Sequence, residues 1–117
     1  MKKPSTDVDL VHGPLHLMIL KILSWGPGHG YGIARAIRRL TDDVLSIEEG
    51  SLYPALHRLE ERGWVEAVWG TTDSNRKARF YTLTEAGREH LGTASPRWLR
   101  FAQAVGQVLL AREQPAG

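Results

Sequence analysis

The stretch EEGSLYPALHRLEERGW, residues 48–64, has the pattern of a short helix with one apolar side. Leu52, Leu56 and Leu59 recur at spacings of four and three residues, which places them in one stripe of a helix. Gly63 stands where helices commonly end in a left-handed residue, and the tryptophan after it can fold back onto the helix. The residues outside the stripe are small, polar or flat, which suits insertion into a DNA major groove: Ser51, Tyr53, Pro54, His57 and Arg58.

Two helices are expected before this one. Gly13-Pro14 predicts the start of the first, because proline suits the first helical turn, and apolar residues then recur at helical spacing to about residue 24. Glycines and a proline break the chain at 25–30, and a second helix is expected over 31–40. Residues 44–47 are a candidate extended bridge. Ser46 could begin a capping box, but we place the start of the third helix nearer Glu49.

A hairpin and a last helix are expected after it. Residues 64–69 and 77–83 alternate as strands, and the turn formers at 70–75 join them with a basic tip. Thr84 is a plausible N-cap for a helix that follows. Ser95-Pro96 interrupts that helix, so either one helix is kinked at Pro96 or Ser95 caps a second one. The apolar stripe keeps its register across the pair, which favours the kink.

Composition restricts the class of protein. At 117 residues, 42% hydrophobic, the chain supports one folded domain, and the lack of cysteine excludes disulfides and thiolate chemistry. No run reaches the ~18 apolar residues that span a bilayer, and the polar start leads into no signal-peptide core, so a cytoplasmic protein without a membrane partner is expected. The net charge of +2 alone does not indicate nucleic acid as a partner; the clustering of arginines matters more.

The expected fold is mainly α with a small β-hairpin: a winged helix-turn-helix plus a C-terminal dimerisation helix. Its expected parts are a flexible arm over 1–12, a winged-helix domain over 13–84, the dimerisation helix over 85–113 and a frayed tail over 114–117.

Four segments in this order resemble the PadR family of bacterial transcriptional regulators: LKIL at 20–23, GHGYGI at 28–33, EGSLYPALHRLE at 49–60 and YTLTEAG at 81–87. The resemblance in sequence covers about residues 13–91. Beyond residue 91 only the expected arrangement of elements is similar. The short length is similar to the form with a single C-terminal dimerisation helix. The resemblance implies a homodimer that binds a pseudo-palindromic DNA operator, usually as a repressor, and is sometimes released by a small molecule.

Each expected DNA contact has a structural alternative. Arg58 is the best candidate for a guanine edge but could pair with Glu61, and Tyr53 could pack on the second helix. Tyr31 could bind a phosphate or serve a core or turn role. The expected wing contacts are also ordinary hairpin-tip residues: Asn75, Arg76, Lys77 and Arg79.

The last helix carries the expected dimer contacts: Leu91, Trp98, Phe101, Ala102, Val105, Val108 and Leu109. Trp98 lies in mid-helix on this stripe. It could simply pack in the interface, or it could stack a small aromatic or apolar effector together with its mate in the second chain.

Other classes fit less well. The alternating glycines at 26–32 do not match Gly-x-Gly-x-x-Gly and follow a helix, where a dinucleotide site needs a strand. His12 and His16 have metal-ligand spacing without an evident third ligand, so neither a metal nor a cofactor is expected, and no catalytic residue is assigned. A winged helix that binds only proteins remains the alternative. The basic residues of the wing and of the third helix favour a DNA-binding protein over it.

Overall fold

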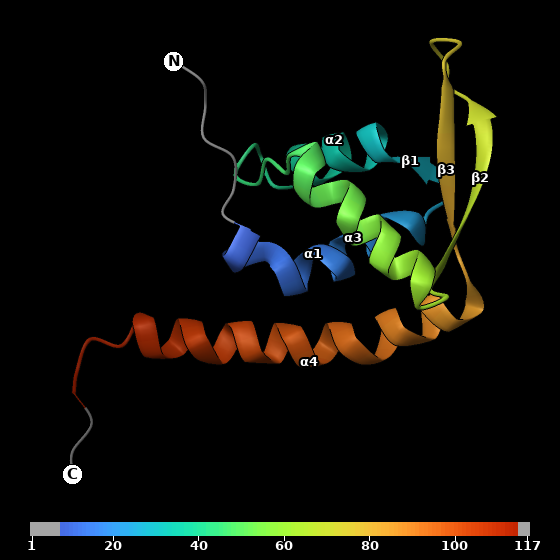
Figure 1. Cartoon of the computed structure of the whole chain (residues 1–117). Coiled ribbons are helices and arrows are strands. Elements are labelled where there is room, and N and C mark those ends of the chain that lie inside the picture. Colours follow the sequence, from blue (N-terminus) through green and yellow to red (C-terminus); the bar gives the residue numbers. More distant parts are fainter. Residues whose placement is uncertain (1–7, 115–117) are drawn as a thin grey trace.

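The computed structural model describes the backbone of residues 8–114 and the side chains of residues 13–114. It is mainly helical, with a three-stranded antiparallel sheet and a long C-terminal helix (Figure 1). The elements are α1 (Val8–Leu23), β1 (Gly28–His29), α2 (Gly30–Leu40), α3 (Glu49–Glu61), β2 (Val65–Thr71), β3 (Lys77–Leu83) and α4 (Glu85–Leu109). The expected winged helix-turn-helix with an added helix is therefore confirmed.

Helix α1 begins earlier than Gly13-Pro14 predicted. It starts at Val8 and contains Pro14, so residues 8–12 of the expected arm are helical, while residues 1–7 lie outside the described part. Proline normally disfavours a helical residue before it by clashing with that residue's Cβ. Gly13 has no Cβ and lies in open space, which permits the helix to continue through the pair.

The third strand is β1, which the sequence patterns did not predict. Its two residues pair with β3, with His29 opposite Phe80, and the two rings meet edge to face at 5.4 Å. The predicted bridge at 44–47 is wrong, since this segment is a loop between α2 and α3. Asp42 and Asp43 have positive φ angles there, and the Leu45 amide donates to the Thr41 hydroxyl, which gives the segment its own local partners.

Helix α3 follows the sequence prediction closely. Its N-cap is Glu48, without a side-chain cap bond, so the helix begins at Glu49 as expected and not at Ile47. The apolar stripe is buried: Leu52, Ala55, Leu56 and Leu59. Gly63 has a φ of 75°, and the Trp64 amide bonds to the Leu59 carbonyl, which is the expected left-handed helix stop.

The wing is the β2–β3 hairpin. Its register pairs Val65 with Leu83 and Trp69 with Arg79. Val65, Tyr81 and Leu83 are buried, so this face of the hairpin closes the core beside α1 and α3.

Helix α4 is joined tightly to the start of the wing. The Thr84 amide donates to the Trp64 carbonyl at 3.1 Å, and the Thr84 hydroxyl accepts from the Gly87 amide at 3.0 Å, so the predicted N-cap is confirmed. The Trp64 and His90 rings stack at 3.7 Å. The helix runs on through Pro96 as one element, so Ser95 does not begin a separate helix.

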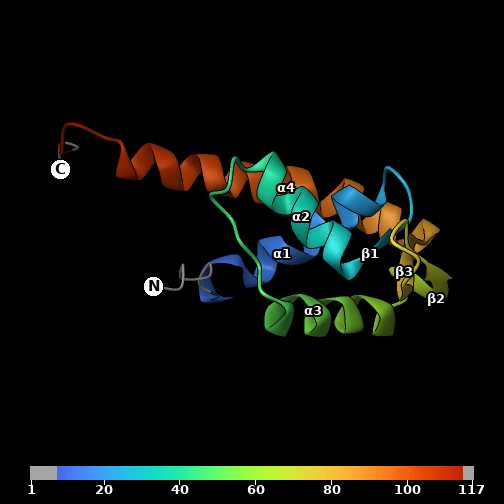
Figure 2. The ribbon, with the colours of Figure 1, turned by 90° about the horizontal axis from the view of Figure 1, so that it is seen from above.

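The last turns of α4 extend beyond the body of the molecule (Figures 1 and 2). The radius of gyration is 16.6 Å and the extents are 61 × 41 × 21 Å. A compact domain of this length would have a radius of gyration of about 13 Å. The difference reflects a helix that packs on α1 at its beginning, while its last apolar residues are exposed in the part of the chain that the structure describes.

Replacing Gly87 should loosen this junction. A Cβ at Gly87 would lie 2.1 Å from the Trp64 carbonyl oxygen, so Gly87→Ala forces the backbone apart and should lower the free energy of unfolding by about 3 kcal/mol in urea titrations. Gly92→Ala is the matched control on the same helix, because a Cβ there meets nothing within 4 Å. It should be stabilising by about 0.5–1 kcal/mol. Equal stabilities of the two variants would contradict this description of the junction.

Candidate nucleic-acid interface

The outward side of α3 is a narrow strip of polar and small residues. Gly50, Tyr53, Pro54, His57 and Glu61 are all exposed, and they follow one another around the face opposite the buried leucines. Figure 2 shows α3 on one side of the body, with α4 on the other side and α1 between them. The strip is therefore open to a large partner that approaches from the side away from α4.

Tyr53 lies across the beginning of α2. A Cβ at Gly30 would come within 2.8 Å of its ring and hydroxyl, so the ring sits directly over that glycine. The side chain keeps 45% of its surface exposed. Tyr53 thus takes the alternative position, packed on helix two, while still presenting part of its ring outward.

Arg58 points toward α1 rather than straight out. Its Nε donates to Nε2 of His16 at 3.3 Å, and its side chain is partly buried. The alternative pairing of Arg58 with Glu61 is wrong, because Glu61 instead lies 2.7 Å from Nε2 of His57. His57, at the centre of the strip, keeps 69% of its side chain exposed. Ser51 lies on the same flank as Arg58 and is partly buried.

The tip of the wing is exposed and basic. The Thr72 amide donates to the Arg76 carbonyl at 2.8 Å, and the Thr72 hydroxyl accepts from the Arg76 amide, which closes the turn. Asn75 occupies the left-handed position with φ of 64°. Arg76 and Lys77 are both exposed, so the tip carries two cations that can reach a phosphate backbone.

Arg79 differs from the other expected wing contacts because it is held by α3. Its Nη2 donates to Oε2 of Glu60 at 3.0 Å, and its guanidinium lies 5.8 Å from the centre of the Tyr81 ring. Burial raises the pKa of the Tyr81 hydroxyl above its usual value, an effect that the neighbouring Arg79 opposes. Arg79 therefore ties the wing to α3.

The beginning of α2 adds a further exposed group. The ring of Tyr31 is parallel to that of His29 with 6.5 Å between centroids, and the Arg35 guanidinium lies 5.7 Å from the Tyr31 ring. His29 caps the helix by accepting from the Gly32 amide. Arg35 was not singled out from the sequence, although its spacing of four from Tyr31 was a signal for this pairing.

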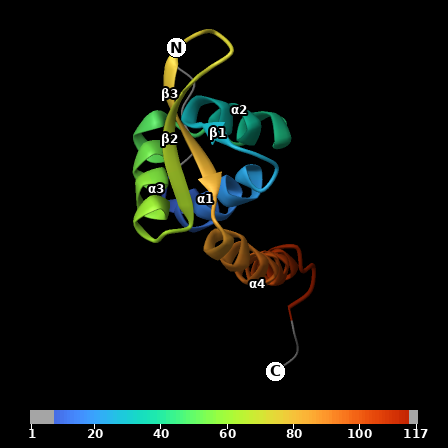
Figure 3. The same ribbon diagram turned by 90° about the vertical axis from the view of Figure 1, so that its right-hand side faces the viewer.

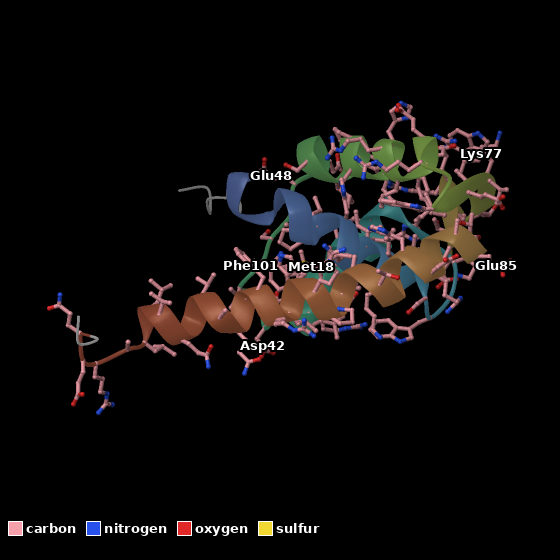
Figure 4. The ribbon with its side chains drawn as sticks, turned by 90° about the horizontal axis from the view of Figure 1, so that it is seen from below. Met18, Asp42, Glu48, Lys77, Glu85 and Phe101 are labelled. Atoms are coloured by element: carbon pink, nitrogen blue, oxygen red, sulfur yellow. The ribbon has the colours of Figure 1, made fainter. Side chains whose placement is uncertain are left out.

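Most of the apolar stripe of α4 lies bare. Leu91 is the exception, because it packs against the core of its own chain. Ala102 has intermediate exposure, and Trp98 is 38% exposed. Figure 4 shows Phe101 where α4 passes the beginning of α1, before the last turns that project from the body. The exposed fractions beyond Trp98 are large for apolar residues: 66% for Phe101, 41% for Val105, 76% for Val108 and 77% for Leu109.

The described residues offer neither a metal site nor a membrane-spanning helix. Within the described side chains, no group of three histidine or acidic residues could hold a metal ion, and His12 lies outside them. No helix in residues 8–114 is long and apolar enough to cross a membrane.

Comparison with known proteins places the chain in a family. The model of the transcriptional regulator PadR-like family matches residues 19–93. Transcriptional regulator YqjI of Escherichia coli K12 is 41% identical over 80 residues, which cover 68% of this chain but only 37% of that protein. An uncharacterized protein of Lysinibacillus sphaericus is 27% identical over 97 residues, 83% of this chain and 89% of its own length.

Solved structures agree with this assignment. A transcriptional regulator from Clostridium thermocellum has a TM-score of 0.75 at 27% identity, covering 85% of this chain and 96% of that one. A PadR family transcriptional regulator from Eggerthella lenta has a TM-score of 0.71 at 28% identity, covering 90% and 89%. The chain belongs to the PadR-like family of transcriptional regulators, which are not enzymes.

Proposed function

We propose that this regulator binds double-stranded DNA with α3 in the major groove and the wing along the flanking backbone. The observation that carries the proposal is the combination of an unobstructed polar face on α3 with a basic tip on the adjoining wing (Figure 3). A helix in the major groove reads base edges, whereas cations near the backbone set affinity and register. A winged helix that bound only proteins would have no need of this pairing.

The contacts divide by position. His57 at the centre of the α3 face, with Pro54 one turn before it, is placed to meet base edges. Ser51 and Arg58 on one flank, and Tyr53 on the other, are placed to meet the groove walls. Backbone contacts then come from Tyr31 and Arg35 at the start of α2 and from the wing: Asn75, Arg76, Lys77 and Arg79.

The active form in this proposal is a homodimer joined through α4. The face that packs on α1 near Leu91 continues to Leu109, and beyond Trp98 its large apolar residues are exposed in the described part of the chain. A second copy related by a two-fold axis would bury this stripe and give two recognition helices, which matches a pseudo-palindromic operator. Occupation of such an operator would make the protein a repressor.

Trp98 supports a further proposal of effector binding. It lies in the middle of α4 and is 38% exposed, so in a dimer it and its mate would flank the centre of the interface. Flat aromatic or apolar molecules could stack between the two indoles and alter the spacing of the recognition helices.

Planar apolar compounds should therefore quench the tryptophan fluorescence of the protein, and Trp98→Phe should remove that quenching. Trp25→Phe is the matched control, because Trp25 is exposed but lies far from α4 in the sequence and on the α1–α2 connection. A broad panel without quenching, or quenching retained in Trp98→Phe, would contradict effector binding at this residue.

DNA contacts of the two kinds should respond differently to substitution. His57→Ala should change the preferred base at one position per half-site, by about 1–3 kcal/mol, because it removes a group that faces base edges. Arg76→Ala should weaken binding to all duplexes and reduce the slope of log affinity against log salt concentration by about 1 per chain. Titrations of the variants with duplexes from the chain's own upstream DNA, at several salt concentrations, measure both effects. If both variants bound every duplex like the parent protein, the contact scheme would be wrong.

A further inference from the structure

An ion pair between Arg79 and Glu60 joins β3 of the wing to α3. The Nη2–Oε2 distance is 3.0 Å, and the side chains remain 41% and 32% exposed. A partly exposed pair of this kind contributes at most about 1 kcal/mol to stability. Its position therefore matters more for binding than for folding.

The pair lies on the face of the hairpin that carries the buried Tyr81 and Leu83, but nearer the tip, where that face is open to solvent. Trp69 is the ladder partner of Arg79, so their side chains project from the same face, and Trp69 is 68% exposed. Glu60 stands on the flank of α3 that faces the wing, one turn after His57. A DNA strand whose groove holds α3 and whose backbone meets the wing would pass beside this pair.

We propose that Glu60 is an affinity-limiting residue that competes with a DNA phosphate for the Arg79 guanidinium. This inference rests on the proposed DNA binding. It adds Glu60, which is not among the DNA contacts proposed above. A guanidinium binds carboxylate and phosphate through the same fork of N–H groups, so one anion must leave as the other arrives. Glu60 also repels the phosphate directly.

The exchange predicts a specific salt dependence. A cation that neutralises a phosphate releases condensed counterions, which steepens the dependence by about 0.9 per phosphate. When Arg79 leaves Glu60, however, the carboxylate becomes bare and takes up its own cations, which offsets that release. In the parent protein Arg79 should therefore add little to the salt slope. Without the Glu60 charge it should add its full share.

Glu60→Gln tests the competition, and Glu61→Gln is the matched control. Both substitutions remove one negative charge from the last turn of α3, but Glu61 contacts His57 rather than Arg79. Glu60→Gln should bind duplex roughly tenfold more tightly at low salt, with a salt slope steeper by about 0.9 per chain. Glu61→Gln should steepen the slope less than Glu60→Gln, because no arginine has to leave Glu61 when a phosphate arrives. Thermal melts followed by circular dichroism confirm that both variants are folded.

The double variant Glu60→Gln/Arg79→Gln separates competition from general charge. The inference expects it to lose the extra slope and most of the gain in affinity. The inference is overturned if Glu60→Gln keeps its full gain in the Arg79→Gln background, or if Glu61→Gln produces the same steepening. If neither the parent nor any variant binds duplex DNA, the proposed function itself is wrong and this inference is overturned with it.

Discussion

The contact on which the arrangement depends is the close approach of Gly87 to the Trp64 carbonyl. This carbonyl accepts from the Thr84 amide, and the Thr84 hydroxyl in turn accepts from the Gly87 amide, so three residues fix the first turn of α4 against the end of α3. A side chain at position 87 would occupy the space of the carbonyl oxygen. The stacked Trp64 and His90 rings extend the contact by another turn. The direction of α4 is thereby set by the same residues that end the recognition helix and begin the wing.

This junction links two surfaces that are far apart. One is the polar face of α3 with the wing tip, and the other is the bare apolar stripe of α4 beyond Trp98. Because the helix between them is continuous through Pro96, a change in how two α4 helices pack would turn the recognition helices with them. In the proposed mechanism this is how an effector between the two helices could reach the DNA without touching it.

The side chains at the α3 surface are already engaged within the chain. Arg58 donates to His16 of α1, and Arg79 donates to Glu60. These contacts keep long side chains in one conformation before any partner arrives, which lowers the ordering cost of binding. In the proposed DNA binding, each arginine would have to exchange its partner within the chain for a DNA group. The affinity for DNA would then depend on how strongly that partner holds the arginine.

Local sequence patterns predicted α3, its glycine stop, the hairpin and the Thr84 cap, because each depends on residues within one or two turns of one another. The strand β1 could not be predicted in this way, since two residues acquire strand geometry only by pairing with β3, fifty positions away. The start of α1 was misplaced because Pro14 carries a strong local signal that Gly13 cancels. The chemical types of the side chains identified the residues of the candidate site. The orientations of Arg58 and Arg79 could not be predicted, because the partners that fix them lie on other elements.

The central claim is that the uncovered face of α4 is where a second copy of the chain docks. Light scattering of the purified protein, alongside Phe101→Glu and the control Gln103→Glu, measures this most directly. Phe101 lies on the bare stripe, and Gln103 is exposed on a different side of the same helix. The account predicts twice the chain mass for the parent and for Gln103→Glu, and a shift toward the single-chain mass for Phe101→Glu, because a buried unpaired charge is costly. A parent protein with the mass of one chain at micromolar concentration, or a Phe101→Glu variant that associates as tightly as the parent, would contradict it.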